Sequence, residues 1–113
     1  MTKTFPVKVK IDRPKGSRHP KFCDLIYPVN YGFVEGVMGG DGQEQDVYVL
    51  GVDEPVSDFE GIVIAIIRRN DDVEEKWVAA PIGTIFSKEE IEEKVHFQEK
   101  YFDSEIILLQ QKG

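Results

Sequence analysis

The sequence predicts an α+β fold, in which a small β-barrel or curled antiparallel sheet carries one helix in the second half of the chain. Two observations support this prediction. Several short apolar segments alternate with turn-forming residues, and one helix-capping signature stands late in the chain, at residues 87–90. A chain of 113 residues has the length of one domain with one modest core, so we expect residues 1–113 to fold as a single domain.

Four segments have the pattern of β-strands. From Phe5 to Ile11, apolar side chains alternate with polar ones, the period-two pattern of a strand with one buried face. Residues 62–67 are apolar at successive positions, which is typical of a strand buried on both faces. Residues 46–52 and 76–80 are the other two predicted strands, and each is bounded by turn-forming or charged residues.

Two further segments leave their conformation open. Residues 27–33 mix aromatic side chains with turn formers, and we expect extended chain that bends at Pro28 and Gly32. Residues 105–109 are short and apolar, so they fit either a closing strand or a helical turn, because periodicity cannot separate the two.

The helix is predicted over about residues 88–102. Ser87 and Glu90 form a capping-box pattern, in which the Ser87 hydroxyl accepts from a first-turn amide while Glu90 reaches back to the cap. Apolar side chains then recur at helical spacing along one face: Ile91, Val95 and Phe102.

Composition and charge narrow the class of function. A net charge of −7 argues against general nucleic-acid binding, which needs a basic face. The longest apolar run, residues 62–67, is too short to span a bilayer, so we expect no membrane insertion. The N-terminus has no apolar signal-peptide core, and the single Cys23 fits a reducing compartment. We therefore expect a cytoplasmic protein.

An acidic cluster precedes the strand predicted at residues 46–52. Asp41, Glu44 and Asp46 place three carboxylates within six residues, directly after a Gly-Gly turn. Such crowded like charges repel each other unless a cation neutralises them, and oxygen ligands at this density suit Mg²⁺ or Mn²⁺. The alternative is a solvated hairpin turn, since Asp-Gly is itself a strong turn signal.

Two other charged segments complete this pattern. Residues 71–75 hold four acids directly before Lys76, while residues 13–21 hold Arg, Lys and His residues and no acid. Each segment alone fits a solvent-facing turn or loop. Together, two acidic clusters and one basic loop are suited to holding a small metal-bound phosphate compound.

The motifs also resemble a known family. They are Tyr27-Pro-x-Asn-Tyr-Gly-Phe33, Asp41-Gly-x-x-x-Asp46, an acidic run closing on Lys76 with Val78-Ala-x-Pro81, and His96-Phe-x-Glu-x-Tyr101. In this order they are similar to the soluble inorganic pyrophosphatases of the Mg²⁺-dependent, barrel-forming type. The resemblance implies an OB-like barrel, Mg²⁺-dependent hydrolysis of inorganic pyrophosphate to two phosphates, and a homo-oligomer.

The resemblance also implies roles for individual residues. The implied metal ligands are acids of the two clusters: Asp41, Asp46 and Glu74, with a further one among Asn70, Asp71 and Asp72. The implied substrate-binding residues are cations and one tyrosine: Lys21, Arg18, Arg13, Lys76 and Tyr101. Tyr31 matches a tyrosine that touches the metal-bound water or the product phosphate.

The chain departs from the family motif at positions that matter for catalysis. The residue thought to help activate water is an Asp in the family and is Gln43 here, an amide that cannot accept a proton usefully near neutral pH. Glu44 could take over this role. Phe102 stands where the family has a phosphate-binding lysine. Two alternatives therefore stay open: hydrolysis of a larger diphosphate or phosphate ester, or non-catalytic binding of metal-phosphate ligands.

Overall fold

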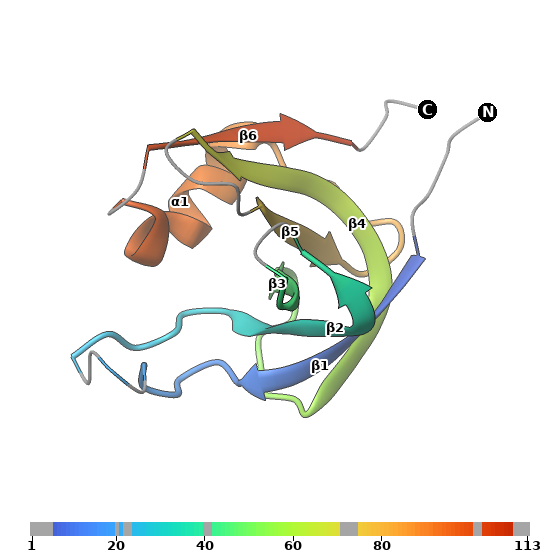
Figure 1. Ribbon diagram of the computed structural model, residues 1–113, viewed down its shortest axis with the longest axis vertical. Helices are drawn as coiled ribbons and strands as arrows, with labels where there is room; N and C mark the ends of the chain where they lie inside the picture. The colour runs from blue at the N-terminus through green and yellow to red at the C-terminus, as the bar shows by residue number, and fades with distance from the viewer. Residues whose placement is uncertain are drawn as a thin grey trace.

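The computed structural model describes residues 6–19, 21, 24–39, 42–70, 75–100 and 103–109. The chain forms six strands and one helix within these ranges (Figure 1). The strands are β1 (Pro6–Arg13), β2 (Asn30–Met38), β3 (Glu44–Val49), β4 (Asp58–Arg69), β5 (Glu75–Ala80) and β6 (Ser104–Leu108). The helix α1 (Lys88–Glu99) lies between β5 and β6 in the sequence.

Five strands close into a barrel. Their order is β1-β2-β3-β5-β4, and β4 pairs back to β1, so every barrel strand has two neighbours. The 12-residue β4 makes this closure because its first part pairs with β1 and its last part pairs with β6 outside the barrel. All pairs are antiparallel except β3–β5, which is parallel. The predicted α+β fold is confirmed, in its barrel form.

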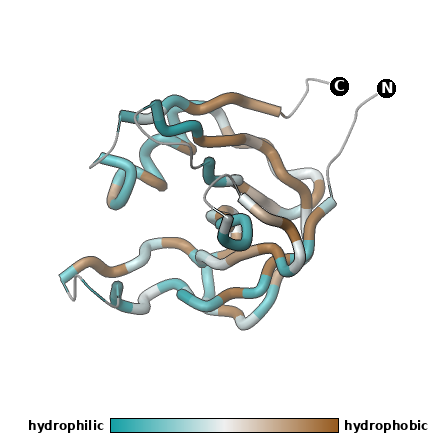
Figure 2. The backbone as a smooth tube through the Cα atoms, in the orientation of Figure 1, coloured by the Kyte–Doolittle hydropathy of each residue, from teal (hydrophilic) through white to brown (hydrophobic). Residues whose placement is uncertain are grey.

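Strand alternation divides the core into two apolar layers. Side chains of all five barrel strands meet in one cluster, which includes Val9, Val34, Val47, Val63 and Ala79 and fills the barrel. Side chains of the opposite parity form a second cluster under α1. In Figure 2 the hydrophobic colour follows β4, whereas α1 is largely hydrophilic, as expected for a helix with one face toward solvent.

The predicted strands are present with shifted ends. Residues 62–67 lie inside the longer β4, and their burial on both faces is confirmed. The strand predicted at residues 46–52 begins earlier, at Glu44, and ends earlier, at Val49. It ends there because Gly51 turns the chain with φ +83°, a backbone conformation that side chains disfavour. The bend expected at Pro28 is present, whereas the bend expected at Gly32 is absent, because the chain enters β2 at Asn30 and stays in the strand.

The start of α1 is confirmed and its predicted end is wrong. The Ser87 hydroxyl accepts from the Glu90 amide at 3.1 Å, and the Ser87 amide donates to the Glu90 carboxylate at 2.9 Å. The helix ends at Glu99 with Lys100 as its cap, rather than at residue 102. Residues 101 and 102 lie outside the described ranges, and β6 begins at Ser104.

The C-terminal apolar segment is a strand. β6 pairs antiparallel with the last part of β4, with Ile106 opposite Ile67, so the strand alternative for residues 105–109 is the one that forms. Within the part of the chain that the structure describes, no helix has the length and apolar character needed to cross a membrane.

Candidate functional site

A cavity of about 920 Å³ opens beside the C-terminal end of α1. Figure 1 shows α1 and β6 on the opposite side of the molecule from β1 and β2. Side chains from β1 through α1 line it: Asp12, Arg13, His19, Asp24, Leu25, Tyr31, Asp46, Arg69, Lys76, Gln98 and Lys100. Four of these are Lys or Arg and three are Asp, so the cavity is locally cationic in a protein of net charge −7.

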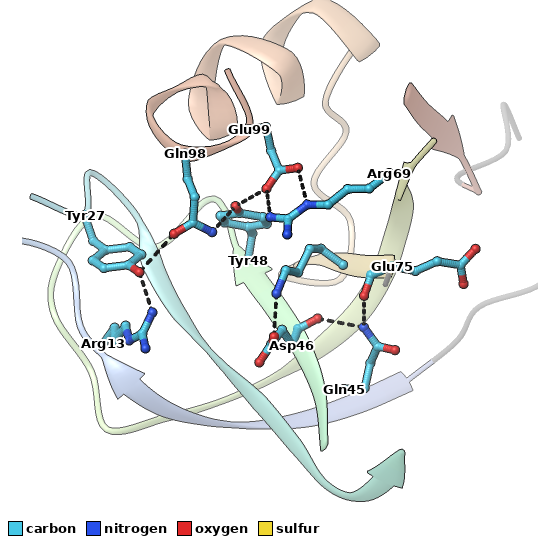
Figure 3. A network of polar contacts seen from close by, with 10 residues as sticks. Arg13, Tyr27, Gln45, Asp46, Tyr48, Arg69, Glu75, Gln98 and Glu99 are labelled. Atoms are coloured by element: carbon cyan, nitrogen blue, oxygen red, sulfur yellow. Dashed lines mark hydrogen bonds and ion pairs between the residues drawn. The ribbon is translucent and has the colours of Figure 1, made fainter. Parts of the chain in front are cut away.

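The parallel pair β3–β5 places an ion pair at the floor of the cavity. Lys76 Nζ donates to Asp46 Oδ2 at 2.5 Å. The lysine side chain is 6% exposed and the Asp46 side chain 31%, so the carboxylate is the partner that reaches the cavity. The buried Gln45 amide donates to the carbonyls of Asp46 (3.0 Å) and Glu75 (2.7 Å), which holds the two strands together at this point (Figure 3).

Tyr31 stands beside this ion pair. It is buried on β2, and Lys76 Nζ lies 5.8 Å from the centre of its ring. Burial raises the pKa of the Tyr31 phenol far above its ordinary value, and the charge of Lys76 opposes that rise without cancelling it. At neutral pH the group is therefore a neutral hydrogen-bonding phenol.

Asp12 brings a second carboxylate to the cavity. It lies near the end of β1, where the strand register shifts between Ile11 and Arg13. Burial raises the pKa of Asp12, Arg13 opposes this effect, and the negative charge of Asp46 adds to the rise. The charge of Asp46 is the smallest of these effects, and both carboxylates line the same cavity.

A buried ion pair anchors the end of α1 above the cavity. The Arg69 guanidinium on β4 binds both oxygens of Glu99, through Nε to Oε1 at 3.1 Å and Nη2 to Oε2 at 2.7 Å. Each side chain is 5% exposed. The Tyr48 hydroxyl donates to the same carboxylate at 2.6 Å. Burial, followed by the charge of Glu99, raises the Tyr48 pKa well above its ordinary value.

Further hydrogen bonds continue from this ion pair across the cavity (Figure 3). The Gln98 amide donates to the Tyr48 hydroxyl at 2.7 Å and accepts from the Tyr27 hydroxyl at 3.1 Å. The Arg13 guanidinium donates to the Tyr27 oxygen at 2.6 Å. The guanidinium carbon of Arg13 also lies 5.6 Å from the ring centres of both Tyr27 and Tyr31.

Two kinds of comparison connect this site with known proteins. No protein-family sequence model matches the chain. An inorganic pyrophosphatase of Xanthomonas campestris pv. campestris is 35% identical over 95 aligned positions, which cover 73% of this chain and 50% of the relative. The enzyme of the same name from Xylella fastidiosa is 33% identical with the same coverage.

The chain belongs to the inorganic pyrophosphatase family. It spans about half the length of the curated relatives it matches. Solved structures share its fold. The inorganic pyrophosphatase of Ehrlichia chaffeensis superposes with a TM-score of 0.71 at 20% identity, over 92% of this chain and 86% of that one. The Neisseria gonorrhoeae inorganic pyrophosphatase gives 0.62 at 22% identity, over 85% and 73%.

The structure brings four of the predicted pyrophosphatase-site residues to the cavity: Arg13, Tyr31, Asp46 and Lys76. Four others lie elsewhere among the described residues. Gln43 is exposed, and the Glu44 carboxylate accepts from the Gly36 amide at 3.1 Å on the β2–β3 hairpin. Arg18 and Lys21 are exposed on the basic loop and do not line the cavity as the structure describes it.

The remaining predicted residues fall outside the described ranges: Asp41, Asp71, Asp72, Glu74 and Tyr101. Four of these five are predicted metal ligands. Within the described residues, no group of three or more His, Cys, Asp or Glu side chains converges on one point. The described donors fit a hard divalent cation by their chemistry, because Asp12 and Asp46 both bring carboxylate oxygens to the cavity.

The sequence does not predict the seven other residues that line the cavity, nor Glu99, which supports Arg69; the seven are Asp12, His19, Asp24, Leu25, Arg69, Gln98 and Lys100. One of them carried a readable signal. Gln98 continues the buried helical face of Ile91 and Val95 at helical spacing, and a polar residue on a buried face needs partners. Arg69 follows the similar Arg68, and nothing local distinguishes the buried arginine from the exposed one.

Proposed function

We propose that this chain hydrolyses inorganic pyrophosphate to two phosphate ions in the cytoplasm, with Mg²⁺ as its cofactor and Mn²⁺ as a substitute. One observation supports this proposal above the others. The cavity of a pyrophosphatase-type barrel here combines the carboxylates of Asp12 and Asp46 with four Lys and Arg side chains, two of which already pair with acids. Carboxylates hold hard cations and the basic groups balance phosphate charge, so one cavity has both halves of a metal-diphosphate site.

The carboxylates of Asp46 and Asp12 would hold the divalent ion, together with the predicted ligands Asp41, Glu74 and one acid of residues 71–72. When bound, the ion supplies an acidified water and withdraws charge from the phosphoryl oxygens. Lys76 fixes the Asp46 carboxylate from the strand side, so that this ligand needs little reordering on binding.

The cations of the cavity would bind the substrate oxygens. The planar guanidinium of Arg13 matches two phosphate oxygens, and Lys76 adds a compact charge at the cavity floor. Tyr31 remains a neutral phenol in the folded protein, so it can donate a hydrogen bond to an oxyanion without giving up its proton. Lys21 and Arg18 on the basic loop remain predicted contributors to this charge.

Water activation is the step for which this chain differs from the family motif. Gln43 is an exposed amide, and Glu44 is engaged with the Gly36 amide on the hairpin. General-base assistance is worth about 10²–10⁴-fold in rate. We therefore propose slow turnover of pyrophosphate, with Glu44 as the substitute base if it leaves the hairpin.

A second candidate function is hydrolysis of a larger diphosphate or phosphate ester. The cavity volume of about 920 Å³ favours it. Pockets for drug-sized ligands occupy roughly 300–1,000 Å³, and pyrophosphate is far smaller than such ligands. Non-catalytic binding of a metal-phosphate compound is the third reading, motivated by Gln43.

Phosphate release over a panel of pyrophosphate, nucleotides and sugar phosphates, with Mg²⁺ or Mn²⁺, separates these readings. We expect metal-dependent release from pyrophosphate and its loss in Asp46→Asn, with Asp58→Asn on the exposed start of β4 as a matched control. Release from a larger diphosphate alone would establish the second candidate. Saturable binding without release from any member of the panel would contradict both enzymatic readings.

The predicted homo-oligomer stays a prediction. Ile82 and Ile85, on the segment before α1, are 78% and 76% exposed, and such large apolar side chains are the kind that a contact between copies would cover. A molecular mass in solution equal to that of one chain, measured by light scattering, would rule the oligomer out.

A further inference from the structure

A continuous series of hydrogen bonds joins the buried ion pair under α1 to Arg13 on the far side of the cavity (Figure 3). We propose that Gln98 is a positioning residue. Its amide links the Tyr48 hydroxyl to the Tyr27 hydroxyl and thereby holds the Arg13 guanidinium toward the substrate phosphates. The inference rests on the proposed function, because it takes Arg13 as a phosphate-binding group.

The direction of every hydrogen bond in the series is fixed by its ends. The Glu99 carboxylate can only accept, so the Tyr48 hydroxyl donates to it and its oxygen is left to accept from the Gln98 amide nitrogen. At the other end the Arg13 guanidinium can only donate, so the Tyr27 oxygen accepts from it and the Tyr27 hydrogen points to Gln98. Each bond in such a series polarises the next.

Gln98 is suited to the middle of this series by its chemistry. Its side chain must donate through nitrogen to one tyrosine and accept through oxygen from the other, and an amide does both at once. The residue is 9% exposed on the face of α1 that meets the barrel. Without the amide, the Tyr48 oxygen loses its donor and the Tyr27 hydroxyl loses its acceptor.

The consequence for Arg13 is orientation. Arginine has several rotatable bonds, and a freely rotating guanidinium loses much of that freedom when it binds a phosphate. The guanidinium carbon lies 5.6 Å from the ring centres of Tyr27 and Tyr31, and such cation–π contacts are less directional than a hydrogen bond. The 2.6 Å hydrogen bond to the Tyr27 oxygen fixes this direction before any ligand arrives.

The test compares Gln98→Met with the unaltered chain. Methionine keeps the length of the side chain and its helix propensity but makes neither hydrogen bond. We expect the dissociation constant for inorganic phosphate, measured by calorimetry in Mg²⁺, to rise about 3- to 10-fold, as for the loss of one aligned hydrogen bond. In an Arg13→Met background the same substitution should change it less than about twofold, because the group that Gln98 positions is gone.

Ser87→Ala is the matched control. It removes the N-terminal cap of the same helix, so it loosens α1 at the end away from the cavity. Phosphate affinity equal to that of the unaltered chain is expected for this variant. A loss as large as that of Gln98→Met would overturn the proposal, since general loosening of α1 would then account for both.

A second measurement keeps the inference separate from the proposed function. In phosphate-free protein, the heteronuclear NOE of the Arg13 Nε–H should be high in the unaltered chain and in Ser87→Ala, and low in Gln98→Met and in Tyr27→Phe. If the unaltered chain binds no phosphate, the proposed function fails while this measurement still decides the positioning role. If the heteronuclear NOE of the Arg13 Nε–H is as high in Gln98→Met and Tyr27→Phe as in the unaltered chain, the positioning role is wrong, whatever the phosphate affinity.

Discussion

Replacing Arg69 by methionine should destabilise the folded protein severely, because it leaves a carboxylate buried without its counter-ion. The side chains of Arg69 and Glu99 are each 5% exposed and share two hydrogen bonds, at 3.1 and 2.7 Å. After the substitution, the Tyr48 hydroxyl is the partner left to the Glu99 carboxylate among the contacts described above. Breaking a buried pair in this way costs about 3–5 kcal/mol of unfolding free energy.

Equilibrium unfolding in urea, followed by circular dichroism, measures this loss. With an m-value of about 2 kcal/mol/M, a loss of 3–5 kcal/mol lowers the midpoint by about 1.5–2.5 M. The neighbouring Arg68→Met is the matched control. Arg68 is 54% exposed, and its contacts with Glu75 (3.4 Å) and Glu105 (4.0 Å) are surface ion pairs, worth about 0–1 kcal/mol.

The double variant Arg69→Met, Glu99→Gln tests the physical reason. If the cost arises from the uncompensated charge, removing that charge should restore most of the lost stability, since apolar or neutral replacement of a whole buried pair is often close to neutral. Equal losses for Arg69→Met and Arg68→Met would refute the reasoning. So would a double variant as unstable as Arg69→Met alone.

Three further predictions concern the cavity. Burial raises the pKa values of Tyr27, Tyr31 and Tyr48, so at pH about 10.5 the folded protein should show less phenolate absorbance than its unfolded chain; the stability gained from these protonated phenols is lost as pH rises further. The pKa of Asp12 is raised on folding, so the metal-free Asp12→Asn variant should be more stable to urea than the unaltered chain at neutral pH, a gain that disappears as pH falls through the folded-state pKa. Gln43→Asp should raise kcat on pyrophosphate by up to about 10²–10⁴-fold, and a slower variant would show that another group is the base.

Most elements of the fold could be predicted because their signals are local. The alternation before Ile11 and the apolar run at residues 62–67 lie within β1 and β4, and the Ser87 and Glu90 pair begins α1 as predicted. The end of α1 could not be predicted from the same signals. The sequence keeps a helical pattern up to residue 102, yet α1 ends at Glu99 and the chain forms β6 from Ser104.

The candidate site likewise holds some residues that the sequence predicts and others that only the fold selects. The sequence predicts Asp46 and Lys76 as site residues, and the β3–β5 pairing brings them to 2.5 Å. Arg18 and Lys21 share the charge and the loop of Arg13, yet Arg13 alone of the three lines the cavity. The reason is position in the barrel, because Arg13 still belongs to β1 whereas the other two follow the turn.

By itself, the sequence determined the α+β class, the helix start, the acidic and basic clusters and the family, because each is written in residue types at fixed spacing. Only the tertiary structure decided which polar residues lie inside. Arg68 and Arg69 are neighbours of one residue type, but β4 alternation exposes the first and buries the second against Glu99, 30 positions later. A strand or helix fixes only the direction of a side chain, and whether that direction meets water or a counter-charge depends on the element that packs there.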